Sequence, residues 1–163
     1  MDDRSGEIRL RPPKPGDLSW LQLRHMQVMG PAHGWEQGYE AHLAEIVAHF
    51  LKAAGGGRER FWVAEQGGRV LGCIGLSQES DRRARLRLMF VEPGARGLGL
   101  GRRLAEACIA FAREASYAEV VLWTVDVLAA ARALYADLGF ELIATTPSEL
   151  AEGMNDETWL LTL

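Results

Sequence analysis

The stretch VEPGARGLGLGRR, Val91–Arg103, joins two segments of opposite character. The apolar run 86–91 precedes it and is broken by Pro93, as expected of a buried strand that ends at a helix and strand breaker. From about Gly101 to Ser116, apolar residues recur at the spacing of one helix face. The sequence therefore predicts a strand, a glycine-rich turn and a helix in succession.

The turn has the composition of an anion site. Gly97, Gly99 and Gly101 carry no Cβ, so the backbone can turn tightly and come close to a ligand. The first amides of a helix lack intrahelical acceptors and lie at its positive dipole end. A phosphate or pyrophosphate is the expected ligand.

Two familiar phosphate sites do not fit these residues. A P-loop requires Lys and then Ser or Thr after its last glycine, but Gly101 is followed by Arg102 and Arg103. A dinucleotide-binding turn requires G-x-G-x-x-G near the start of a βαβ array. The glycines here have the wrong last interval, and they lie in the middle of the chain.

Two motifs together carry a resemblance to a known family. Arg96–Gly101 (RGLGLG) resembles the R/Q-x-x-G-x-G/A signature of the GCN5-related N-acetyltransferases (GNAT family). Ala129–Glu141 (AAARALYADLGFE) resembles the second signature of that family, A-x-x-L-Y-x-x-x-G-F. The segments 86–88, 122–124 and 157–161 look closest to the acetyltransferase half of MarR-type regulator fusions. The DNA-binding half of those fusions has no counterpart here, so DNA binding is not implied.

The resemblance implies acetyl-CoA as co-substrate. Amides of the glycine turn would hold its pyrophosphate, and main-chain groups of a splayed central strand would bond the pantetheine and the thioester carbonyl. The residues that this assigns to acetyl-CoA are Met89, Phe90, Val91, Arg96, Gly97, Leu98, Gly99, Leu100, Gly101 and Arg102. Tyr135 matches the tyrosine that protonates the leaving thiolate, so it is the predicted catalytic acid.

The general base is not assigned by the sequence. Some relatives place a Glu on the central strand, where this chain has Arg85–Leu88. The nearest acidic side chains are Glu79, Asp81, Glu92 and Asp126, of which Glu79 lies at the end of a neighbouring strand. A water relay, or an acceptor that arrives as a neutral amine, would need no dedicated base.

The acceptor is expected against two N-terminal helices, where His33, Trp35 and Tyr39 are candidates to line a pocket. Arg85 and Arg87 share one strand face and suit a carboxylate, which points to an amino acid or peptide. The expected function is acetyl-CoA-dependent N-acetylation of a primary amine of a small molecule, amino acid or peptide by direct attack. The alternative is an acyl-CoA-binding sensor without turnover.

Composition limits the remaining possibilities. A chain of 163 residues suits one domain over 1–163, with the fold proper from about residue 8. The net charge of −4 argues against a general nucleic-acid binder. Two cysteines are too few for a disulfide scaffold, the four histidines show no metal-ligand spacing, and no apolar run could span a membrane. We therefore expect a cytoplasmic protein without metal, nucleic-acid or membrane partners, and the resemblance implies a homodimer.

The pattern along the chain predicts the order β-α-α-β-β-β-α-β-α-β-β and an α/β (α+β) fold. In it a mixed, mostly antiparallel sheet carries helices on both faces. Locally, Asp17 is the expected cap of the first helix, and Gly30-Pro31 its expected end. Two positions depart from the family pattern. Val127-Leu128-Ala129 lacks the usual Asn, and Ser116 stands where glycine is usual after the cofactor helix.

Overall fold

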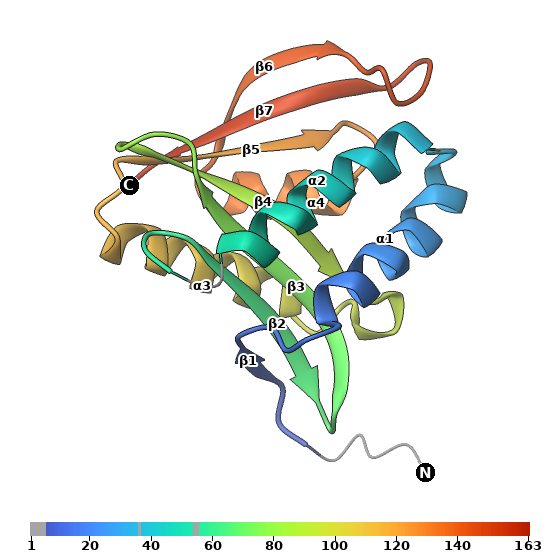
Figure 1. Cartoon of the computed structure of the whole chain (residues 1–163). Helices are drawn as coiled ribbons and strands as arrows, with labels where there is room; N and C mark the ends of the chain where they lie inside the picture. The colour runs from blue at the N-terminus through green and yellow to red at the C-terminus, as the bar shows by residue number, and fades with distance from the viewer. Residues whose placement is uncertain (1–5, 36, 54–55) are drawn as a thin grey trace.

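A seven-stranded sheet runs through the molecule in the order β1-β2-β3-β4-β5-β7-β6 (Figure 1). The computed structural model describes residues 6–35, 37–53 and 56–163. The strands are β1 (Arg9–Arg11), β2 (Arg60–Gln66), β3 (Arg69–Gln78), β4 (Arg83–Val91), β5 (Glu119–Val125), β6 (Glu141–Pro147) and β7 (Asn155–Thr162). The helices are α1 (Asp17–His33), α2 (Gln37–Ala53), α3 (Leu100–Glu114) and α4 (Ala129–Asp137), with a short 3-10 helix at Pro93–Ala95.

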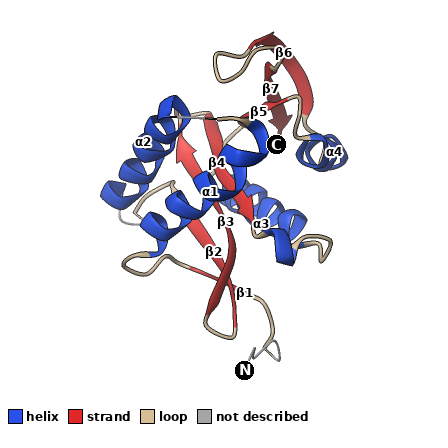
Figure 2. Cartoon of the chain, turned by 90° about the vertical axis from the view of Figure 1, so that its right-hand side faces the viewer, coloured by secondary structure: helices blue, strands red, loops and turns tan. Residues whose placement is uncertain are grey.

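Helices cover both faces of this sheet, and each face has its own apolar core. Leu21 of α1 and Leu43 and Phe50 of α2 pack on one face. Leu104 of α3 and Tyr135 of α4 belong to the core on the other face. Figure 2 shows α2 and α3 on opposite sides of the strands. The predicted element order and fold class are confirmed, since every strand pair except β4–β5 is antiparallel.

The one parallel pair is short, and this opens the sheet. Strands β4 and β5 pair only over Arg83–Arg85 and Glu119–Val121, and beyond these residues they diverge (Figure 1). Main-chain groups along the second half of β4 therefore have no partner strand on the β5 side. An open edge inside a sheet is a place where a ligand can take the missing hydrogen bonds.

A bulge reshapes β4 at the same place. Cys73 lies opposite Phe90 and Gly75 opposite Arg87, so one residue of β3 faces two residues of β4. The extra residue, Leu88, has a φ of 51°, which is uncommon for a residue with a side chain. Gly72 allows the close approach, because a Cβ there would lie 2.4 Å from the carbonyl oxygen of Phe90.

Two local predictions were wrong. Helix α1 does not end at Gly30-Pro31 but continues to His33, where Gly34 (φ 70°) donates to the carbonyl of Gly30 at 2.7 Å. Pro31 lies near the end of the helix, where few main-chain bonds remain to be lost. Asp17 is not the cap, because that position belongs to Gly16 and the Asp17 carboxylate binds Arg11 at 2.7 Å. No helix among the described residues has the length and apolar character to cross a membrane.

Candidate active site

A cavity of about 1240 Å³ lies where β4 and β5 separate. Residues of α1, α2, β4, β5, the glycine turn, α4 and the β6–β7 hairpin line it. The structure brings nine of the ten predicted acetyl-CoA-binding residues to this cavity, together with Tyr135. The exception is Leu98, whose side chain is 67% exposed, so only its main chain is available to a ligand in the turn.

The glycine turn has the conformation that its sequence predicts. Gly97 (φ 79°) and Gly99 (φ 74°) both adopt the left-handed region that favours glycine. Gly99 is the N-cap of α3, and no side chain caps the helix. A Cβ at either glycine would meet nothing within 4 Å, so the space over the turn is open. The free amides at the start of α3 therefore face an accessible anion site.

The arginines near the turn differ in their availability. Arg96 lines the cavity and forms no ion pair with any described residue. Arg102 also lines it, but its guanidinium pairs with Asp137 of α4 and lies 3.7 Å from Glu106. Arg103 turns away and donates to the carbonyl of Ile8 at 2.7 Å. Arg96 is thus the cation most available to an anion at this end of the cavity.

Tyr135 lies on α4 and closes the cavity from the side of the α3 core. It is only 5% exposed, with its ring 5.8 Å from that of Phe140. Burial raises the pKa of the Tyr135 phenol well above its usual value. The hydroxyl has no hydrogen-bond partner among the described residues. Tyr135 therefore keeps its proton at neutral pH and can donate it to a group in the cavity.

The opposite end of the cavity is aromatic. His33, Trp35 and Tyr39, the three pocket candidates from the sequence, all line it. The hydroxyl of Tyr39 is 2.5 Å from Nε2 of His25, and the His25 ring lies 5.4 Å from the ring of Phe90. Burial lowers the pKa of His25 to about 4, so the imidazole is neutral at physiological pH. This end is apolar but retains polar atoms that can orient a small ligand.

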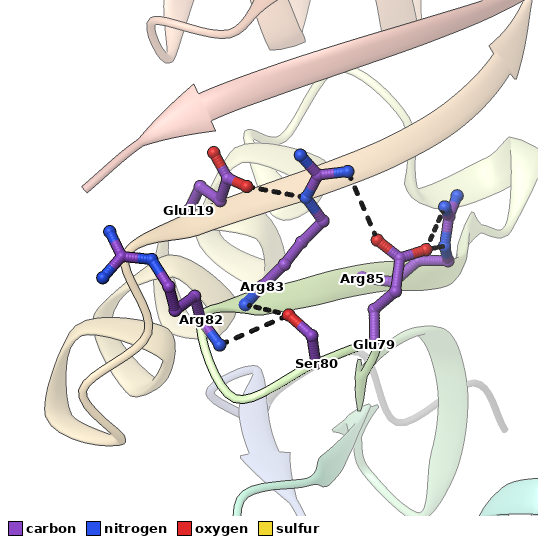
Figure 3. Close-up of polar contacts among 6 residues, drawn as sticks. All are labelled: Glu79, Ser80, Arg82, Arg83, Arg85 and Glu119. Carbon is purple, nitrogen blue, oxygen red and sulfur yellow. Dashed lines mark hydrogen bonds and ion pairs between the residues drawn. The ribbon is translucent and has the colours of Figure 1, made fainter.

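Arg85 and Arg87, which the sequence places on one strand face, both line the cavity but differ in their partners. Arg85 is held by Glu79 at 2.5 Å, and Arg83 pairs with Glu119 at 2.7 Å and with Glu79 at 3.7 Å (Figure 3). Arg87 has only a long contact of 3.5 Å to Ser77 Oγ and no carboxylate partner among the described residues. Burial and the neighbouring Arg85 charge lower the pKa of the half-buried Arg87 guanidinium. Arg87 is therefore, beside Arg96 at the glycine turn, a cation of the cavity without a carboxylate partner among the described residues.

None of the four acidic candidates from the sequence lines the cavity. Glu79 is bound by arginines, and Glu92 pairs with Arg24 at 2.5 and 2.9 Å. The Asp126 carboxylate accepts hydrogen bonds from Asn155, and Asp81 is exposed.

The cavity instead contains Glu149 and Asp156, which the sequence analysis missed. Both belong to the last hairpin, where no motif marks a site. Asp156 is placed by the pairing of β7 with β5, and Glu149 lies in the loop between β6 and β7.

The described part of the chain holds neither a metal site nor a cysteine nucleophile. It contains no group of three His, Cys, Asp or Glu side chains that could hold a metal ion. Cys73 and Cys108 are fully buried, and burial raises the pKa of both thiols far above the usual range. Thiols held protonated in a core do not act as nucleophiles at neutral pH.

Comparisons with known proteins agree with this site. Residues 20–140 match the family model described as Acetyltransferase (GNAT) family. N-acetylaspartate synthetase of Danio rerio is 37% identical over 113 residues, which is 69% of this chain and 39% of that protein. The chain thus spans about two fifths of the length of that relative.

Solved structures share the fold. An N-acetyltransferase from Staphylococcus aureus Mu50 superposes with a TM-score of 0.79 at 18% identity, covering 96% of this chain and 98% of the other. The yncA protein of Salmonella typhimurium, solved with its cofactor acetyl-CoA, gives 0.75 at 19% identity, with 96% and 94% covered. At such identities the likeness concerns the fold alone. The match to the family model covers most of the chain, which therefore belongs to the GNAT family of acetyltransferases.

Proposed function

We propose that this protein is an N-acetyltransferase that moves the acetyl group of acetyl-CoA to a primary amine by direct attack. The observation that carries the proposal is one cavity that joins three features. These are the glycine turn at the start of α3, the open edge of β4 and the buried phenol of Tyr135. An anion site, main-chain donors and a proton donor are what transfer from a thioester requires.

The residues present fit acetyl-CoA. The open space over Gly97 and Gly99 and the free amides of α3 suit its pyrophosphate, with Arg96 as a nearby counter-charge. Met89, Phe90 and Val91 lie on the part of β4 that has no partner strand on its β5 side, so main-chain groups that point to that side are available to the pantetheine and the thioester carbonyl. Acetyl-CoA would supply the activated acetyl group, and a main-chain donor at the carbonyl would polarise it.

The chain's own groups would then manage charge and protons. Tyr135 holds its proton beside the place where a thiolate would leave, and donation of that proton would prevent the reverse attack. Cys73 and Cys108 are protonated core residues, so no covalent enzyme intermediate is required. The apolar walls of the acceptor end, formed by Trp35 and Leu43 among others, would keep water from the thioester.

We further propose that the acceptor amine carries a carboxylate, as an amino acid or a peptide does. Arg87 supports this, because it is a half-buried guanidinium in the cavity without a carboxylate partner among the described residues. A desolvated arginine binds a carboxylate more strongly than an exposed one. The relative named N-acetylaspartate synthetase also favours an acidic amino acid.

Binding and turnover test these proposals separately. Titration calorimetry with acetyl-CoA should show micromolar binding to the wild type and none to Gly99→Glu, since a carboxylate over the turn would repel the pyrophosphate. Thiol release should then be measured with amino acids, peptides, polyamines and aminoglycosides. Arg87→Gln should raise KM for carboxylate-bearing acceptors roughly tenfold or more, while the exposed Arg82→Gln should not.

The alternative, a sensor that binds acyl-CoA without turnover, gives a different result. A sensor would bind acetyl-CoA in the titration but release no thiol with any amine of the panel. The buried, protonated Tyr135 in the cavity favours the enzyme, because binding alone has no use for a proton donor there. Turnover confined to polyamines or aminoglycosides would refute the carboxylate-bearing acceptor alone.

Three further proposals extend the sequence analysis. A homodimer through β6 is supported by the position of this strand at the sheet edge, with all seven of its residues exposed, Leu142 and Ile143 included. Light scattering on the wild type and on Ile143→Lys would test it. Two free cysteines favour a cytoplasmic location. The closer likeness to MarR-fusion acetyltransferases stays a hypothesis on sequence segments, and no DNA binding is proposed with it.

A further inference from the structure

Unpartnered polar atoms in the described part of the chain gather at the cavity. Four buried side-chain nitrogen or oxygen atoms have no hydrogen-bond partner: His25 Nδ1, Trp35 Nε1, Asp156 Oδ1 and Trp159 Nε1. Three of them belong to residues that line the cavity, all except Trp159. A buried polar atom without a partner costs free energy unless a ligand or water satisfies it. Asp156 is the only carboxylate among the four.

The sheet register places Asp156 on the acceptor side. In the β5–β7 ladder, Asp156 lies opposite Val125 and Thr158 opposite Trp123. Residues opposite one another in an antiparallel pair share a sheet face, and alternate residues repeat it. Val125 belongs to the core under α1 and α2, so Asp156 and Trp123 face the same helices. Arg87 lines the same cavity from β4.

The neighbours of Asp156 leave its charge uncompensated. The side chain of Asn155 donates to Asp126 at 2.8 Å, and the carboxylate of Glu157 accepts from Arg132 at 2.5 Å. The two residues that flank Asp156 therefore have partners of their own. The other ionisable residues that line the cavity on this side are His25 and His33 of α1, Tyr39 and His42 of α2, Arg85 and Arg87 of β4, and Glu149 of the β6–β7 hairpin. Arg85 is paired with Glu79. Burial, aided by Arg87, lowers the pKa of His42, which therefore brings no positive charge at neutral pH. No ion pair joins Asp156 to a described cation.

We propose that Asp156 binds the ammonium group of the acceptor and is the first base to take its proton. This rests on the proposed acetyltransferase function. An N–H bond of the ammonium breaks, an O–H bond forms on the Asp156 carboxylate, and the electron pair left on nitrogen is free to attack the thioester. Arg87 and Asp156 then present opposite charges in one cavity, which suits an acceptor that bears both an amine and a carboxylate.

The test compares Asp156→Asn with the wild type over a range of pH. Asparagine keeps the size of the side chain but neither attracts an ammonium nor accepts its proton. At pH 7 we expect kcat/KM to fall roughly a hundredfold, in the range usual for a general base. The deficit should shrink toward tenfold or less as pH rises through the pKa of the acceptor amine, about 8 for the α-amino group of a peptide and about 10.4 for a lysine-type amine, because the amine then loses its proton to solvent. Asp81→Asn, an exposed position on the β3–β4 loop, serves as the matched control.

Each outcome decides one question. A ratio of wild-type to variant kcat/KM that shrinks with pH supports the inference, provided that acetyl-CoA binding and the unfolding midpoint of the variant are unchanged. A ratio that stays constant with pH, or a variant within twofold of the wild type at pH 7, overturns it. A wild type that binds acetyl-CoA and releases no thiol with any amine refutes the proposed function, and this inference with it. If only amines without a carboxylate turn over, the same comparison is made on those amines.

Discussion

The guanidinium of Arg132 lies 2.5 Å from the carboxylate of Glu157, which is only 2% exposed. Arg132 precedes Tyr135 by one turn of α4, and Glu157 lies in the middle of the face of β7 that packs on this helix. The pair fixes α4 to the sheet at the level of the cavity. It therefore helps to position the phenol of Tyr135, together with the packing of the Tyr135 ring in the core.

Removing one partner of the Arg132–Glu157 pair should destabilise the protein far more than removing both. Arg132→Met leaves a buried carboxylate without a cation, and we expect it to lower the free energy of unfolding by about 3 kcal/mol. The double variant Arg132→Met/Glu157→Leu should recover most of this loss, since two apolar groups have no charge to desolvate. Urea denaturation of the three proteins measures the difference. Equal losses in the single and double variants would contradict this account.

Tyr135→Phe isolates the proton donor. The ring is buried and its hydroxyl has no partner among the described residues, so stability should change little. We expect kcat to fall roughly 10- to 100-fold. The loss is smaller than it would be for a reaction with a poor leaving group, because a thiolate leaves readily even without a proton donor. KM for the acceptor should stay within twofold.

The matched control is Tyr117→Phe, which loses a hydrogen bond to the carbonyl of Arg58 outside the cavity and should keep full kcat. A Tyr135→Phe variant with wild-type kcat would remove Tyr135 from the mechanism.

His25 should make stability depend on pH in a defined window. Burial lowers its pKa from 6.5 to about 4 in the folded state, so the unfolded chain binds a proton more readily between these values. The free energy of unfolding should therefore fall as pH drops from about 7 to about 4, by up to about 3 kcal/mol from this group. His25→Gln should lack that slope, even if the lost bond to Tyr39 lowers its stability at every pH. Parallel pH curves for the two proteins would exclude the assignment.

The carboxylates of Asp17 and Glu65 affect stability at lower pH than His25 does. Salt bridges to Arg11 keep the pKa values of Asp17 and Glu65 below their ordinary values of 3.8 and 4.5. Stability from such groups is present above the ordinary pKa and is lost as pH falls through the lowered one. As pH falls, the loss of stability from Asp17 and Glu65 therefore begins where the loss from His25 is nearly complete. One titration of stability against pH can separate the two contributions.

Sequence patterns predicted what depends on local chemistry. Glycines that must adopt positive φ and an amphipathic helix that follows them mark the turn at Gly97 and Gly99 without knowledge of the rest of the chain. The difference between Arg85 and Arg87 was not predictable, because it depends on Glu79 reaching across the β3–β4 hairpin. Asp156 was missed for a related reason. Its place in the cavity follows from strand register over some thirty residues, to which no single motif corresponds.

Ser116 shows how a departure from a family pattern becomes a measurable cost. It has a φ of 64° directly after α3, where its N–H donates to Arg113 at 3.0 Å and that of Tyr117 donates to Ala112 at 3.1 Å. This is the Schellman ending, in which glycine is favoured at the left-handed position. The side chain is exposed and forms no hydrogen bond with a described residue.

Ser116→Gly should therefore stabilise the protein by about 0.5–1 kcal/mol, the relief of left-handed strain less the added entropy of the unfolded chain. Ala115→Gly, at the preceding position with a φ of −78°, should instead destabilise it. Thermal unfolding of both variants checks the sign, and a Ser116→Gly variant less stable than the wild type would contradict the assignment of strain to this residue.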